Sequence, residues 1–71
     1  MSFLNDLKYD YNYYLRRYYN GCKYCSEHID EVDKWLPELL DIMDNINLLG
    51  IEISKYIEMT EEEILYGFKI K

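Results

Sequence analysis

The sequence predicts a small all-α domain, formed by a helical hairpin and a short C-terminal helix packed across it. Apolar residues recur at steps of three and four along most of the chain, and a single proline interrupts them. The 71 residues make one domain. A chain of this size buries only about 60% of its unfolded surface. Domains of this size commonly need a disulfide, a metal, a second copy or a permanent partner. With 49% apolar residues and one proline, this chain is nonetheless expected to fold.

The first predicted helix covers residues 3–20. Its apolar face is formed by Leu4, Leu7, Tyr11, Tyr14, Leu15 and Tyr18. Ser2 is a candidate N-cap, and Asp6 lies in the first turn, where negative charge is favourable. Gly21 offers a left-handed stop directly after the predicted last turn.

The second predicted helix covers residues 26–49, with Ser26 as its candidate cap. The apolar face assigned to it consists of Ile29, Val32, Leu36, Leu39 or Leu40, Met43 and Ile46. A residue before proline is pushed away from helical dihedrals, so Pro37 interrupts the pattern. The apolar spacing is the same on both sides of it. This predicts either a kink or two successive helices with Pro37 in the first turn of the second.

Residues 51–59 fit a helix by their isoleucine spacing and a strand by their alternation, so both interpretations stay open. Thr60 and Glu63 then have the spacing of a capping box, in which each side chain binds the other residue's backbone N–H. This box predicts a short C-terminal helix that ends at Gly67.

Residues 50–69 also resemble a helix-turn-helix unit of the repressor type. The matching apolar and small positions are Ile53, Ser54, Ile57, Met59, Ile64 and Gly67. Glu58, however, stands where a turn glycine is usual. Glu61, Glu62 and Glu63 open what would be the recognition helix, where phosphates would repel them. We therefore expect no direct binding of nucleic acid.

The charge of the chain is distributed unevenly. The formal net charge is −6, with a local +2 over residues 1–24, −10 over residues 25–63 and +2 over residues 64–71. Nucleic acid and anionic membranes repel an acidic protein, so its natural partner is a basic protein surface. The start of the chain lacks the pattern of a signal peptide, and no apolar run is long enough to cross a bilayer. We expect a cytoplasmic protein.

The candidate partner-binding carboxylates share one predicted helix face: Glu27, Asp30, Glu31, Glu38, Asp41 and Asp44. Only Lys34 lies nearby, although a helix built for solubility gains from Glu–Lys pairs four residues apart. At a rise of about 1.5 Å per residue, Asp30 and Asp44 are about 21 Å apart, over which a DNA strand presents several phosphates. The competing interpretation is an ordinary solvated helix face.

A second candidate surface lies on the first helix, opposite its leucines. It consists of Tyr9, Tyr13, Arg16 and Arg17, residue types that are enriched at binding hot spots. Singly exposed aromatics on a solvated face are the competing interpretation. A homodimer formed through the tyrosines is a further alternative.

Cys22, Cys25 and His28 have the spacing of part of a zinc knuckle. A structural zinc site needs four ligands, so Glu27 or Glu31 would have to complete it. Two reduced, half-buried thiols are the competing interpretation, and we expect no cofactor. The sequence offers one histidine, no phosphate-binding loop and no nucleophile–base pair, which argues against an enzyme.

The chain is acidic, rich in Tyr, Ile and Asn, and ends in MTEEEILYGFKIK. In these respects it resembles small proteins of bacteriophages that infect low-GC bacteria, among them inhibitors of host defence such as anti-CRISPR proteins. The resemblance implies a non-catalytic inhibitor that acts in the host cytoplasm. Such an inhibitor binds a host effector complex and blocks its nucleic-acid channel, as a nucleic-acid mimic, or its assembly. A self-associating adaptor and a small zinc-stabilised regulator are the alternatives.

Overall fold

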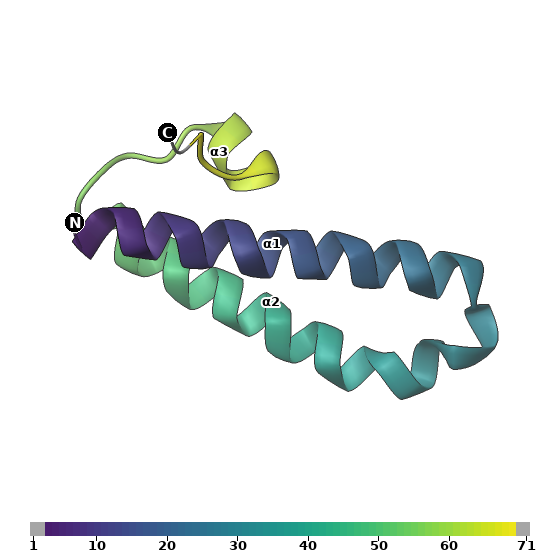
Figure 1. Cartoon of the computed structure of the whole chain (residues 1–71). Helices are drawn as coiled ribbons and strands as arrows, with labels where there is room; N and C mark the ends of the chain where they lie inside the picture. Colours follow the sequence, from purple (N-terminus) through teal and green to yellow (C-terminus); the bar gives the residue numbers. More distant parts are fainter. Residues whose placement is uncertain (1–2, 70–71) are drawn as a thin grey trace.

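The computed structural model describes residues 3–69, which form a helical hairpin with a short third helix (Figure 1). Helix α1 spans Phe3–Glu27, and a 3-10 turn, η1, covers Ile29–Glu31. Helix α2 spans Val32–Ser54 and runs antiparallel to α1, while α3 covers Glu61–Tyr66. Residues 3–69 contain no strand, so the all-α prediction is confirmed. The candidate cap at position 2 lies outside the described residues.

Helix α1 is longer than predicted, because Gly21 lies inside it and does not end it. A Cβ atom at Gly21 would meet the side chain of Leu39 on α2. The glycine thus allows the two helices to approach closely, and α1 continues to Glu27. The predicted boundary at residue 20 was wrong, since the role of this glycine depends on a residue far away in the sequence.

The start of α2 also differs from the prediction. Ser26 lies in the last turn of α1, where its hydroxyl donates to the Lys23 carbonyl at 2.7 Å, so it does not cap the second helix. The turn η1 leads directly into α2. Pro37 is exposed and lies inside α2, beyond the first turn to which one interpretation assigned it. The helix continues to Ser54, and turn and irregular structure connect it to α3.

The face of α2 that meets α1 shares Leu39 and Ile46 with the predicted face but is rotated from it. The stripe that faces α1 consists of Trp35, Leu39, Ile42, Ile46, Leu49 and Ile53. Leu36, Leu40 and Met43 were assigned to the core, yet they are 44%, 51% and 37% exposed. Ile29 in η1 is exposed as well. The prediction failed because α2 carries two neighbouring apolar stripes, and both have helical spacing.

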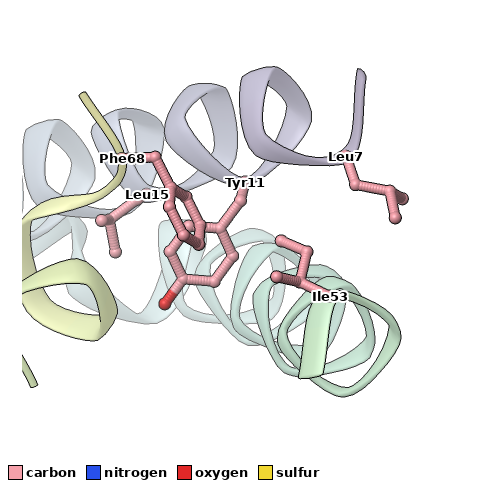
Figure 2. Packing of buried hydrophobic residues seen from close by; sticks show 5 residues of the cluster. All are labelled: Leu7, Tyr11, Leu15, Ile53 and Phe68. Carbon is pink, nitrogen blue, oxygen red and sulfur yellow. The ribbon is translucent and has the colours of Figure 1, made fainter. Parts of the chain in front are cut away.

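The core lies at the end of the hairpin where α1 begins and α2 ends, and Figure 2 shows five buried side chains of this core. It consists of Leu7, Tyr11, Leu15, Ile53 and Phe68, with Leu4, Ile46, Leu49, Ile57 and Met59 packed around them.

Tyr11 is 2% exposed, contacts the Phe68 ring edge-on and donates its hydroxyl to the Ile64 carbonyl at 2.8 Å. Burial raises the pKa of Tyr11 above its ordinary value. Tyr19 likewise donates to the Leu65 carbonyl at 2.6 Å, so two tyrosines of α1 bind carbonyls of α3.

The C-terminal helix is built as the sequence predicts. Thr60 and Glu63 form the capping box through bonds of 3.0 and 3.1 Å, and Gly67 ends the helix at a φ of 87°. The side chain of Asn12 on α1 then holds the following residue. Its amide donates to the Phe68 carbonyl at 2.8 Å, and its oxygen accepts from the Phe68 N–H at 2.7 Å. These bonds fix the end of the chain across the hairpin.

Candidate interaction surfaces

The predicted acidic residues lie at the loop between the helices and along α2. We call them the acidic ridge: Glu27, Asp30, Glu31, Glu38, Asp41 and Asp44. Five of them are exposed, and Glu31 is half-buried. Asp33 is also exposed, in the first turn of α2, and sequence reasoning missed it. The preference of helix N-termini for acidic side chains is the signal that would have found it.

Two members of the ridge have partners within the chain. The Arg17 guanidinium is 3.1 Å from a carboxylate oxygen of Glu38, and both side chains are nearly half exposed. The hydroxyl of Tyr24 donates to Glu31 at 2.8 Å, and this bond raises the pKa of Tyr24. The other four carboxylates form no ion pair within residues 3–69. Most of the ridge's negative charge is therefore available to another molecule.

The part of the ridge on α2 follows a gradual turn around the helix. Glu38, Asp41 and Asp44 are three residues apart, so each is rotated by about 60° from the one before it. Glu38 lies at the edge next to α1, where Arg17 reaches it. Asp44 lies on the outer side of α2, two residues from the buried Ile42. The carboxylates thus cover one flank of α2 and do not form a straight line.

The tyrosine–arginine patch lies on the outer face of α1 and consists of Tyr9, Tyr13, Arg16 and Arg17, as predicted from helical spacing. Tyr9 and Tyr13 are 54% and 52% exposed and lie on either side of the buried Tyr11 in the sequence. Arg16 borders the same shallow groove as both tyrosines. Arg17 lies over the Tyr13 ring, 5.8 Å from its centroid, and also binds Glu38. Arg17 therefore connects the patch to the acidic ridge.

The loop end also holds the residues of the possible zinc site. Cys25 is buried, Cys22 is half-buried, and both are free thiols. A hydrogen bond between Tyr18 and Cys22 raises the pKa of Tyr18. His28 stacks on Tyr24 at 4.1 Å, and its Nδ1 is 3.0 Å from the Tyr24 carbonyl oxygen. Within residues 3–69, no three His, Cys, Asp or Glu side chains are placed to hold one metal ion.

A third surface was missed because its apolar residues had been placed on the predicted core face, Leu40 as the alternative to Leu39. Leu36, Leu40, Met43 and Asn47 follow one another at steps of four, three and four on the outside of α2. We call them the α2 seam. Beside Asn47 begins an open groove between α2 and α3 of about 700 Å³. Its lining is mostly aliphatic and includes Ile46, Ile51, Ile57, Met59 and Ile64.

No helix within residues 3–69 combines the length and apolar character needed to cross a membrane. In comparisons with known proteins, no family model, no curated protein and no solved structure matches the chain.

Proposed function

We propose that this chain is a non-catalytic inhibitor that binds a basic, nucleic-acid-handling protein. The acidic ridge is the observation that carries this proposal. Its carboxylates are exposed or half-exposed, and within residues 3–69 five of the six form no ion pair. A flank with so many unpaired carboxylates attracts a basic surface over a distance and accelerates association with it.

The composition of the flank favours a binding role over simple solubility. Lys34 is the one basic residue among positions 27–44 of the sequence. On a solubilising helix, alternating Glu and Lys side chains would lower the mutual repulsion of the carboxylates. Here the repulsion persists in the free protein, and a basic partner would relieve it. A surface that normally binds phosphates would provide that relief, which is why we propose a nucleic-acid-handling partner.

The tyrosine–arginine patch would supply short-range contacts to the same partner. Tyr13 presents a half-exposed ring that already supports the Arg17 guanidinium, so little side-chain freedom is lost on binding. Arg17 in turn contacts Glu38, so a partner that covers the ridge at this edge also reaches the patch. In this arrangement the ridge steers the partner and the patch anchors it. The resemblance to phage inhibitors suggests a bacterial effector complex as the partner.

The test compares two variants with the same change in net charge. Replacing Asp30, Asp41 and Asp44 by Asn removes three carboxylates from the ridge. Replacing Glu58, Glu61 and Glu62 by Gln removes three exposed carboxylates from the other end of the chain. Each immobilised protein is exposed to a nuclease-treated bacterial lysate, and the captured proteins are identified by mass spectrometry.

We expect the unchanged chain and the Gln variant to capture the same basic nucleic-acid-binding protein, and the Asn variant to lose it. A duplex or single-stranded oligonucleotide should displace the captured protein, and its affinity should fall steeply with salt. Equal capture by both variants would remove the ridge from the mechanism. Capture of proteins that no oligonucleotide displaces would contradict the nucleic-acid-handling partner.

A further inference from the structure

The chain exposes more surface than a compact monomer of its mass. Its accessible area is 5544 Å², whereas a monomer of 8.7 kDa is expected to expose about 4,700 Å². The excess of roughly 800 Å² is the area that one partner loses in a standard protein–protein interface. The radius of gyration of 13.4 Å likewise exceeds the roughly 11 Å expected for this length. About one interface's worth of surface is therefore uncovered.

The α2 seam is the apolar part of this surface with the most regular spacing. Its steps of four, three and four are those of the a and d positions of a coiled coil, which meet a partner helix. Leu36, Leu40 and Met43 supply the apolar contacts, and Asn47 takes the last of the four positions. The neighbouring stripe of α2, rotated by about 100° from the seam, already packs on α1. A helix with two apolar stripes can contact two other helices.

We propose that the α2 seam packs against the same seam of a second copy, forming a two-fold symmetric dimer with antiparallel α2 helices. A seam of a and d residues is complementary to itself, which a symmetric interface requires. This dimer does not depend on the proposed function. Glu38 and Asp41 are rotated by more than about 100° around α2 from the seam, and of the ridge residues on α2 Asp44 borders it.

The distribution of charge along α2 determines the antiparallel orientation. The first half of the helix carries Asp33, Glu38, Asp41 and Asp44, whereas the part after Asp44 carries only Glu52 as an acidic residue. In a parallel pair the two acidic halves would lie side by side and repel each other. In an antiparallel pair Asp33 and Glu38 of each copy lie beside the segment around residues 45–50 of the other helix, which carries no acidic residue.

The seam also sets the position of the symmetry axis. With the axis between Leu40 and Met43, these two side chains fill the centre of the interface. Leu36 then lies opposite Asn47 of the partner subunit, near the edge, where the amide reaches water. Both leucines and the methionine lose their exposed area, and the only polar seam residue keeps its solvation.

The test measures the oligomeric state of the protein alone, by sedimentation over a wide range of concentrations. The double variant Leu40→Asp, Met43→Asp places four carboxylates near the proposed axis. We expect the unchanged chain to sediment as a dimer and this variant as a monomer, with a dissociation constant raised at least roughly 100-fold. Its helicity by circular dichroism should be retained, because both side chains are exposed in the single chain.

Leu48→Asp is the matched control, since Leu48 is on the same helix and exposed but lies outside the seam. It should leave the dimer intact. A monomer at all concentrations, or equal dissociation by the control, would overturn the proposal. Loss of the dimer in Tyr13→Asp with retention in the double variant would place the interface on the tyrosine–arginine patch instead.

The orientation is tested by disulfide cross-linking in a chain whose native Cys22 and Cys25 are replaced by Ala and whose helicity is first checked. One version carries Leu36→Cys and the other Asn47→Cys. In the antiparallel dimer, a mixture of the two chains cross-links rapidly and either chain alone cross-links slowly. Rapid cross-linking of each chain with itself would show a parallel pair.

Discussion

The two ends of the hairpin are packed differently although the same two helices form both. At the covered end, which comprises residues 3–15 and 46–68, the core residues of α1 and α2 meet beneath Phe68. At the loop end, which comprises residues 17–44, the buried side chains are Cys25 and Ile42. The difference arises because α3 (Figure 1) and Phe68 (Figure 2) lie over one end and not the other.

This contrast shows what a third element contributes to a small hairpin. Two helices can bury only the stripe between them, and a further layer is needed to enclose more apolar surface. At the loop end His28 stacks on Tyr24 and Trp35 meets Tyr24 edge-on, and the Trp35 Nε1 is buried without a partner in the described chain. The acidic ridge and most of the α2 seam lie at this end. The less enclosed end thus carries the surfaces available to other molecules.

The largest expected effect compares the same substitution at the two ends of α2. Ile53→Ala removes a fully buried side chain from the core cluster, so we expect a loss of about 4 kcal/mol in the free energy of unfolding. Ile42→Ala removes the same atoms beside an open groove lined by Trp35 and Leu39, and we expect about 2 kcal/mol. Urea denaturation followed by circular dichroism measures both values.

Because a loss of this size can unfold a small domain, Ile53→Val and Ile42→Val provide a milder pair. Their expected costs are about 1.5 and 0.5 kcal/mol, in the same order. Equal costs at the two positions would mean that the loop end is packed as tightly as the covered end, and would contradict the difference in packing between the two ends.

Asn12→Ala should make the covered end more like the loop end. The substitution removes both hydrogen bonds to the Phe68 backbone, and we expect a loss of about 2 kcal/mol. Hydrogen exchange should show faster exchange at Ile64 and Gly67, whose amides depend on α3. Asn45→Ala is the control, because its exposed amide donates only to the Asp41 carbonyl within α2. Unchanged exchange in α3 would mean that packing of Phe68, not Asn12, holds the helix in place.

Features that depend on residues close together in the sequence could be predicted from the sequence. The buried face of α1 through Leu7, Tyr11 and Leu15 follows from spacing alone, as does the exposure of Tyr9 and Tyr13. The capping box before α3 is likewise a short motif whose two hydrogen bonds form within one turn. Such features require no knowledge of how the helices meet.

Features that depend on contacts between helices could not be predicted in this way. Spacing gave no reason to prefer the stripe of Ile42 over that of Leu40 and Met43, because both repeat with the helix. To predict the ion pair of Arg17 with Glu38, one must know the register of α1 against α2. The predicted end of α1 before Gly21 gave the wrong register. The missed seam therefore results from the same ambiguity that misassigned the core.

The smallest expected effect concerns the ion pair at the loop end. Arg17 and Glu38 are 43% and 45% exposed, so a double-mutant cycle with Ala should give a coupling of about 0.5 kcal/mol, decreasing with salt. The exposed pair of Lys55 with Glu52, at the same 3.1 Å distance, is the control at the covered end and should give a similar value. The two ends differ in the burial of their apolar side chains, whereas the ion pairs at both ends are exposed to solvent. A coupling above about 2 kcal/mol for Arg17 and Glu38 alone would mean that charge, and not side-chain packing, closes the loop end.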